Sequence, residues 1–471
     1  MDSKVKELLT NSFLFTLASL GSKILVFLMV PFYTYILTPA EYGVAGVVQT
    51  TTTLLLPLMT AKIQDAVLRF CFIKGIDQRQ VFSIGIKVSL SGVLVSIMLT
   101  VVCWNLPLFA EVGGYVVFVP LTVFSTSLSH MMSHFSRGIG NVKGSAASGV
   151  INTFIVVVLN LWFLLGIGLG VTGYLLSYVL ADIISIAYLI YSSKLYRYVT
   201  YHTSKILCRN MLAFSLPLVP TSLSWWLLSS FNNFYILSVL GASLVGLYTA
   251  SMRVPSILTV LSDIFSQAWL LSALKNYGSD ESTKFIRAVH RKFFAMLCFM
   301  TGGITLLTYP ISNILLSGEF IESWRIIPLL FVSVFWGALV GFYGSIFSAE
   351  NKTTIQLIST VTGAVISVII VMLFLKKYGL SVVTTATMVG YFVVWLIRKL
   401  VLKKYIDIGM STLLCIVHGG LLTIIAILVA KEYYWYAIAA YILVLALNFS
   451  ELLKIQRFFW KETVAYINRK L

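Results

Sequence analysis

The sequence predicts an all-α polytopic membrane protein with about 14 transmembrane helices, and three observations lead to that prediction. Only 11% of the 471 residues are charged and 59% are hydrophobic, whereas a soluble chain carries roughly 25% charged residues. Apolar windows of about 20 residues, long enough to cross a hydrocarbon core of about 30 Å, recur along almost the whole chain. The windows are continuously apolar rather than alternating, which favours helices over the strands of a barrel.

The expected spans follow one another with short connections, which leave no room for a soluble catalytic domain. The first apolar stretch is too long for a signal-peptide core of about 7–15 residues and lacks a small-x-small cleavage site, so we expect it to remain as a span. The Cys residues are scattered and predict neither a disulfide framework nor a metal site. The predicted spans are 11–37, 43–68, 81–105, 114–136, 145–168, 171–192, 211–240, 245–273, 290–316, 326–349, 354–375, 379–401, 411–430 and 435–453.

The distribution of the 34 Lys and Arg residues predicts the orientation of these spans. With a cytoplasmic N-terminus, only Arg325, Lys376, Lys377 and Lys431 fall in outside loops. Lys23, Lys62 and Arg253 lie within spans, and the rest, Arg398 and Lys399 among them, fall in inside segments. The positive-inside rule therefore predicts a multi-pass protein with both termini cytoplasmic. The net charge of +17 reflects this placement, and we expect no nucleic-acid partner.

An internal repeat divides the chain. The segment ILTPAEYGVAG resembles VLGASLVGLYTAS, which places Gly43 opposite Gly246, and a looser match places Gly170 opposite Gly379. Each copy holds six spans and so has the same orientation, an architecture of secondary transporters in which the substrate binds between the repeats. We expect an N-terminal six-helix bundle at 1–205, a pseudo-symmetric second bundle at 206–405 around a central cavity, and two additional helices with a basic cytoplasmic tail at 406–471.

The residues from Ser22 to Gly46 read SKILVFLMVPFYTYILTPAEYGVAG. This segment resembles the opening signature of bacterial polysaccharide exporters, the lipid-linked oligosaccharide flippases of the multidrug/oligosaccharidyl-lipid/polysaccharide exporter superfamily. The turn RGIGNVKGS and the later segment LNLWFLLGIGLGVTGYLLSYVLAD add weaker matches.

The resemblance implies a transporter, not an enzyme. It would reside in the bacterial cytoplasmic (inner) membrane and flip an undecaprenyl-pyrophosphate-linked oligosaccharide repeat unit, of the O-antigen, capsule or exopolysaccharide type, to the outer leaflet by alternating access. Membrane lipids, and a polymerase and glycosyltransferases of the same pathway, would be its partners. We expect a monomer.

Cations within the spans are the first candidates for binding the pyrophosphate. A charged side chain near a helix centre costs at least about 2.5–3.5 kcal/mol on insertion scales, so Lys23 and Arg253 require an explanation. Both are expected to meet phosphate oxygens, Arg253 with its planar fork, or else to form structural ion pairs. A first-span cation with an eighth-span arginine is also similar to the cavity of the lipid II flippases.

A second group of charges lies on the second span. Lys62, Asp65 and Arg69 follow at i, i+3 and i+7 on one helix face, where neighbours three or four residues apart can pair. We interpret them first as a self-satisfied charge ladder. The alternative is a cytoplasmic site at which Lys62 or Arg69 first binds the pyrophosphate head group.

Uncharged and acidic groups within spans are candidates for sugar contacts or ion coupling. The coupling ion would be H⁺ or Na⁺, and no bound cofactor is expected. For each of these residues, ordinary interhelical hydrogen bonding is the alternative. His130 and His134 are spaced i, i+4 without a third ligand, so no metal site is expected. The candidates are Asp65, Asp182, Asp263, Gln267, Asn152, Asn232 and Asn233.

Two other functions are compatible with parts of the sequence. A multidrug exporter of the same superfamily would share the fold, but exporters of cations favour an acidic cavity, whereas Lys23 and Arg253 are cationic. A membrane-embedded glycosyltransferase or polymerase of the same pathway would need an acidic catalytic cluster or a large outside loop, and neither is evident. The absence of a G-x-x-x-x-G-K-[ST] motif argues against ATP hydrolysis by this chain.

Overall fold

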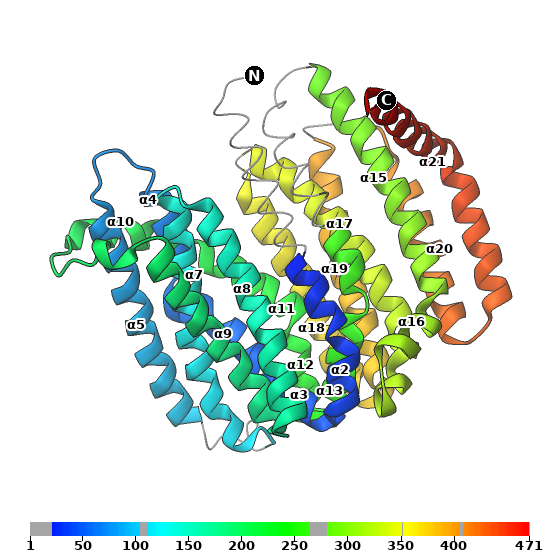
Figure 1. The fold of residues 1–471 in the computed structure, drawn as a ribbon. Coiled ribbons are helices and arrows are strands. Elements are labelled where there is room, and N and C mark those ends of the chain that lie inside the picture. The colour runs from blue at the N-terminus through cyan, green and yellow to red at the C-terminus, as the bar shows by residue number, and fades with distance from the viewer. Residues whose placement is uncertain are drawn as a thin grey trace. The chain divides into compact units, whose positions relative to one another are not determined.

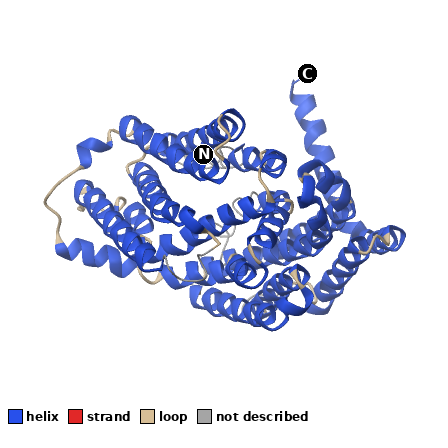
Figure 2. Ribbon diagram, turned by 90° about the horizontal axis from the view of Figure 1, so that it is seen from below, coloured by secondary structure: helices blue, strands red, loops and turns tan. Residues whose placement is uncertain are grey.

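The computed structural model describes residues 21–103, 111–262, 265, 280–350, 352–404 and 408–470. Within those ranges the chain forms helices joined by turns and contains no strand (Figures 1 and 2). This confirms the predicted all-α membrane fold. Helices are the expected outcome for continuously apolar segments, because a helix satisfies its own backbone donors and acceptors without water.

The number of spans can be compared with the prediction only in the described part of the chain. There, 11 helices are long and apolar enough to cross a membrane, or up to 13 if each of two bent pairs is one span. The first predicted span, 11–37, begins outside the described residues, and its described part is the short apolar helix Gly21–Ile36. The total of fourteen therefore stays a prediction.

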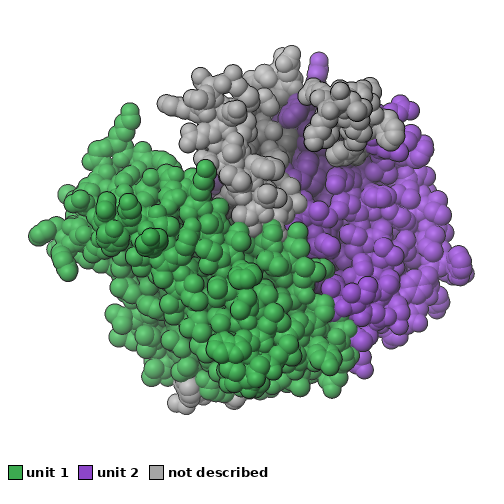
Figure 3. Space-filling model, in the orientation of Figure 1, with its two compact units in different colours: residues 1–250, 316–320 green, residues 251–315, 321–471 purple. Residues whose placement is uncertain are grey.

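The chain forms two compact units, which are coloured separately in Figure 3. Unit 1 comprises residues 1–250 and 316–320, and unit 2 comprises residues 251–315 and 321–471. Unit 1 extends beyond the predicted N-terminal bundle because the seventh span packs with it. The predicted division at 205 and 405 follows the sequence repeat and stays a prediction.

Unit 1 is organised around one helix, α7, which packs against α3, α4, α5, α8 and α9. Helices α8 and α9 also pair closely with each other. The helices of this unit are α2 (Val30–Ile36), α3 (Pro39–Thr60), α4 (Ile63–Phe70), α5 (Gln78–Cys103), α7 (Phe118–Gly138), α8 (Val142–Leu161), α9 (Gly170–Ser192), α10 (Lys205–Ser215), α11 (Leu218–Ser229), α12 (Phe231–Leu240) and the first part of α13 (Ala242–Arg253).

Unit 2 is organised in the same way around α17, which packs against α15, α18, α19 and α20. Helices α18 and α19 form the closest pair, and α21 packs on α15 and α20. The helices of this unit are α15 (Asp280–Leu306), α16 (Thr308–Leu315), α17 (Ile327–Ala349), α18 (Thr353–Tyr378), α19 (Leu380–Leu402), α20 (Thr412–Ala430) and α21 (Tyr434–Lys470).

The two packing arrangements support the repeat read from the sequence. Helix α7 is the fourth predicted span and α17 the tenth, so the same member of each six-span copy is central. The closest pairs, α8 with α9 and α18 with α19, are likewise the fifth and sixth members of their copies. Gly170 and Gly379 both have positive φ, 52° and 61°, where α9 and α19 begin. A positive φ at this turn explains why both copies carry glycine there.

The first matched segment of the repeat encodes a helix start and a helix contact. Thr38 accepts a hydrogen bond from Glu41 N, and the Glu41 carboxylate accepts one from Thr38 N at 2.8 Å, with Pro39 in the first turn of α3. This is a capping box followed by a favourable first-turn proline. A Cβ on Gly43 would overlap the carbonyl of Ala242, and one on Gly246 would overlap that of Pro39. The two repeat glycines therefore meet face to face.

Several predicted spans are interrupted, which the sequence analysis did not foresee. The seventh is divided into α10, α11 and α12. In the second span, Ala61 and Lys62 have φ of 48° and 54° between α3 and α4. In the eighth, α13 ends at Arg253 and a helix resumes at Ser256, with a 40° bend. The ninth bends by 66° between α15 and α16. Pro255 explains the eighth-span break, because proline lacks the N–H that a continuous helix needs. Broken spans are characteristic of the binding sites of transporters.

Candidate functional site

Helix α7 carries a line of polar residues through unit 1, which we call the polar stripe. Thr122 Oγ1 lies 2.6 Å from Thr52 Oγ1 of α3. His130 lies on the same face of α7, one helical turn after Thr126, and its side chain is exposed in the structure. The polar stripe consists of Thr122, Ser125, Thr126, His130, His134 and Arg137.

At one end of the polar stripe lies a charge cluster centred on Asp65. Lys62 Nζ lies 3.2 Å from Asp65 Oδ2, and His134 Nδ1 lies 3.7 Å from Asp65 Oδ1. The side chains of Lys62 and Asp65 are 26% and 31% exposed. Ion pairs between partly exposed side chains contribute at most about 1 kcal/mol. The pair can therefore open at little cost and leave Lys62 available to an anion.

The backbone at Lys62 explains how the cation reaches this position. Ala61 and Lys62 are consecutive non-glycine residues in the left-handed region, and each costs roughly 1–2 kcal/mol relative to a right-handed helix. Strain of this kind persists only where surrounding packing enforces it, and it clusters at functional sites. Here Ile63, the first residue of α4, is fully buried and anchors the chain after the break.

The predicted charge ladder is formed only in its first half. Lys62 pairs with Asp65 as the spacing indicated. Arg69 instead places its guanidinium over the ring of Phe214 from α10, with Cζ 4.2 Å from the ring centroid. This cation–π contact joins α4 to α10, and it assigns Arg69 a structural contact that the sequence analysis did not identify.

A second polar centre forms around Asp182 of α9, in the middle of unit 1. Its Oδ2 accepts hydrogen bonds from Ser125 Oγ at 3.0 Å and Thr126 Oγ1 at 2.8 Å, and its Oδ1 accepts one from Asn152 Nδ2 at 2.9 Å. Two of the predicted residues, Asn152 and Asp182, thus lie together. Among the described residues no Lys or Arg forms an ion pair with Asp182. Three donors from two other helices fix this carboxylate without neutralising it.

The predicted sugar-contact residues of α12 are used in contacts within unit 1. Asn232 is buried and donates to Tyr248 Oη at 3.3 Å. Asn233 donates to Thr50 Oγ1 at 2.9 Å, and Trp226 Nε1 donates to Thr50 O at 3.1 Å. These are interhelical hydrogen bonds, the alternative that the sequence left open for them.

The two cations proposed to share a cavity belong to different units. Lys23 is exposed near the start of the described part of the first span in unit 1. Arg253 is partly buried in unit 2 and ends α13 at the eighth-span break, where Ser256 Oγ donates to its carbonyl. That they face one cavity stays a prediction. Asp263 and Gln267 lie outside the described residues.

Sequence reasoning missed most of the polar stripe. His130 and His134 were weighed only as metal ligands, although polar residues recur every three or four positions from Thr122 to Arg137. That spacing is the signal of one helix face and could have identified the stripe. In the part of the chain that the structure describes, no group of three or more His, Cys, Asp or Glu side chains could hold a metal ion.

Comparison with known proteins assigns the chain to a family. The sequence profile described as "Polysaccharide biosynthesis protein" matches residues 8–271. No protein of curated function matches the sequence.

Solved structures of transporters share the fold. The lipid II flippase MurJ, in an inward closed conformation, matches with a TM-score of 0.69 at 12% identity, and the match covers 96% of this chain and 100% of MurJ. An inward-facing multidrug resistance transporter of the MATE family has a TM-score of 0.63 at 17% identity, over 83% of this chain and 96% of its own. A transporter of the MOP superfamily from Pyrococcus furiosus matches with a TM-score of 0.55 at 16% identity, and the match covers 85% of this chain and 95% of that transporter.

The profile match covers more than half of the chain, and the structural matches extend the same fold over nearly all of it. This chain belongs to the polysaccharide biosynthesis protein family.

Proposed function

We propose that this protein flips an undecaprenyl-pyrophosphate-linked oligosaccharide from the inner to the outer leaflet of the bacterial cytoplasmic membrane, with both termini cytoplasmic and as a monomer. The observation that carries the proposal is the break at Ala61 and Lys62, which places a weakly paired cation within a membrane span. An ionisable group held at such a place, at a cost in backbone strain, is a functional candidate by default.

The substrate chemistry matches the cations at the breaks. A pyrophosphate presents several anionic oxygens, which ammonium and guanidinium groups bind by charge-assisted hydrogen bonds. Lys62 and Arg253 each border a break in a span. Because Lys62 gives up only a weak, partly hydrated pair with Asp65, exchanging that carboxylate for a phosphate costs little. Lys23 supplies a third embedded cation.

The membrane potential favours this direction of transport. An inside-negative potential drives an anion outward by roughly 2.3 kcal/mol per charge per 100 mV. The cations must then release the phosphate, and the empty carrier must return. Asp182 is the coupling group that we propose for this step, because it is a carboxylate in a span with three hydrogen-bond donors and no ion-pair partner among the described residues.

The proposal is tested by export of surface polysaccharide in a strain that lacks its own flippase. Lys62→Ala and Arg253→Ala should abolish export while the protein remains in the membrane at normal levels. Arg253→Lys should retain part of the activity, because the charge persists but the bidentate fork is lost. Lys143→Ala is the matched control, since Lys143 is an exposed lysine at the start of α8 in unit 1.

Normal export by well-expressed Lys62→Ala and Arg253→Ala variants would overturn the proposal. Resistance to cationic drugs on expression, with no effect on surface polysaccharide, would favour a multidrug exporter of the same superfamily instead. Polymerase and glycosyltransferases encoded beside this chain would support the pathway that we propose.

A further inference from the structure

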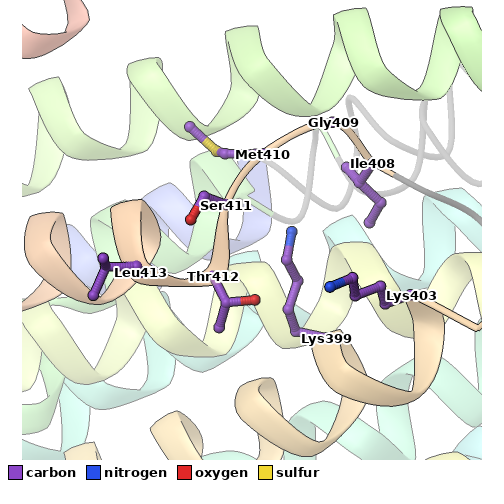
Figure 4. Close-up of a pocket in the computed structure, with 8 residues that line it drawn as sticks. All are labelled: Lys399, Lys403, Ile408, Gly409, Met410, Ser411, Thr412 and Leu413. Carbon is purple, nitrogen blue, oxygen red and sulfur yellow. The ribbon is translucent and has the colours of Figure 1, made fainter.

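Unit 2 contains a pocket that the proposed transport route does not use. It has a volume of about 500 Å³ and lies between the end of α19 and the start of α20 (Figure 4). A volume of this size accommodates a small organic group rather than a bare ion. The pocket is lined by Lys399, Lys403, Ile408, Gly409, Met410, Ser411, Thr412 and Leu413.

Two lysines supply the charge of the pocket. Lys399 and Lys403 are one helical turn apart at the end of α19. Lys399 extends from α19 toward the segment Gly409–Ser411, and the nitrogen of Lys403 points toward Lys399 (Figure 4). Lys399 is only 6% exposed, and its Nζ lies 5.8 Å from the ring centroid of Tyr343. Lys403 is exposed. One ammonium group therefore lies at the buried side of the pocket and the other at its open side.

The wall opposite α19 is also basic. Arg291 of α15 donates from Nη2 to the carbonyl of Gly409 at 3.2 Å. Gly409 has φ of 69°, and a Cβ there would meet Arg287 Cδ at 3.1 Å. The left-handed glycine thus lets the loop pass close against two arginines of α15, which keeps their positive charge beside the pocket.

The first turn of α20 completes the lining. Ser411 is the N-cap residue, but its side chain accepts no capping hydrogen bond, and the first turn contains no acidic residue. The N-terminal N–H groups of a helix favour a negative charge. Among the described residues that line the pocket there is no Asp or Glu, and Asp407 lies outside the described residues.

A simpler explanation accounts for only part of this arrangement. Lysines near a helix C-terminus interact favourably with the last carbonyl groups, and Lys399 and Lys403 occupy such positions on α19. That role can be filled by exposed side chains, as Lys376 and Lys377 do at the end of α18. It does not explain a cavity lined by two lysines and bordered by two arginines.

We propose that this pocket binds a phosphate-bearing group, held by Lys399 and Lys403. The phosphate could be supplied by the head group of an acidic membrane lipid or by a soluble phosphate ester, and both offer the same oxyanion to the two ammonium groups. The distribution of Lys and Arg predicts that this end of α19 lies on the cytoplasmic side. The proposal is independent of the flippase substrate, because none of the residues proposed to bind the pyrophosphate lines this pocket.

The test is thermal unfolding of the purified, delipidated full-length protein in detergent, titrated with phosphatidylglycerol or with glycerol 3-phosphate. A ligand that binds the folded state raises the unfolding temperature in a saturable manner. Lys403→Gln and the double variant Lys399→Gln/Lys403→Gln should raise the half-saturating concentration about tenfold or more, the effect of losing a charge-assisted hydrogen bond.

The matched control is Lys376→Gln/Lys377→Gln, which removes the same charge from another helix C-terminus and should titrate like the unaltered protein. Lys403→Gln keeps the test valid if the buried substitution at Lys399 impairs folding. Saturation by phosphatidylglycerol alone assigns the pocket to a lipid head group, and saturation by glycerol 3-phosphate assigns it to the phosphate group itself. The proposal is overturned if neither probe stabilises the protein, or if Lys403→Gln titrates like the control.

Discussion

Gly43→Ala tests whether the repeat glycines form the contact between α3 and α13. A Cβ on Gly43 would overlap the carbonyl oxygen of Ala242 and lie 2.9 Å from Gly246 N, whereas one on Gly246 would overlap the carbonyl oxygen of Pro39 and lie 3.0 Å from Gly43 N. All of these obstructing atoms belong to backbone, so no side chain can rotate away. The helices must separate to admit the methyl group.

The expected magnitude follows from two opposing effects. Separating well-packed elements typically costs about 1–3 kcal/mol, while replacing glycine by alanine inside a helix gains up to about 1 kcal/mol. Gly43→Ala should therefore destabilise unit 1 by up to about 2 kcal/mol. Gly149→Ala is the matched control, because Gly149 lies within α8 and has no atom within 4 Å of an added Cβ. That variant should be neutral or more stable.

The assay is the free energy of unfolding of the purified protein in mixed micelles. Gly43→Ala and Gly246→Ala should each be less stable than Gly149→Ala. The double variant Gly43→Ala/Gly246→Ala should lose less stability than the sum of the two single losses, because the first methyl group already separates the helices. If Gly43→Ala were as stable as Gly149→Ala, the close contact inferred from the backbone would be refuted.

Three other predictions address the cap, a buried arginine and the topology. Thr38→Val should lower the free energy of unfolding by about 1 kcal/mol through loss of the capping box of α3. Thr38→Ser, which keeps the hydroxyl, should retain most of that free energy in the same assay. Arg398→Leu should sharply reduce the yield of folded protein on size-exclusion chromatography. Arg398 is 1% exposed and donates to Val340 O, Ser359 Oγ and Thr360 Oγ1, so its removal would leave these buried acceptors unpaired. A monodisperse Arg398→Leu variant at normal yield would contradict this prediction. Reporter fusions after Lys205 should report a cytoplasmic location and fusions after Glu319 an external one, and an external signal at Lys205 would contradict the span assignment.

Asp182→Asn separates the proposed coupling role from a structural one. The amide keeps the size of the side chain and can still accept hydrogen bonds from Ser125 and Thr126, so the folded protein should remain at normal levels. It cannot carry the negative charge, so export should no longer respond to an imposed H⁺ or Na⁺ gradient. A variant that transports with unchanged ion dependence would remove Asp182 from the coupling step.

The sequence by itself determined the membrane class, the repeat and part of the charge pairing. These follow from local composition and spacing, because apolar length decides whether a segment can span a bilayer and a separation of three residues already predicted that Lys62 and Asp65 could pair. The alignment of Gly43 with Gly246 was also visible, although nothing in the sequence indicated that the two residues touch.

Only the tertiary structure decided the features that depend on segments far apart in the chain. The donors to Asp182 come from α7 and α8, and the partner of Arg69 comes from α10. The break at Ala61 and Lys62 has no glycine to mark it, since packing rather than local preference holds these residues in a left-handed conformation. Arg398 and Lys399 were counted with the inside segments, but they are buried in α19. Their environment is set by α15, α17, α18 and the start of α20, and no local pattern in the sequence specifies which helices those will be.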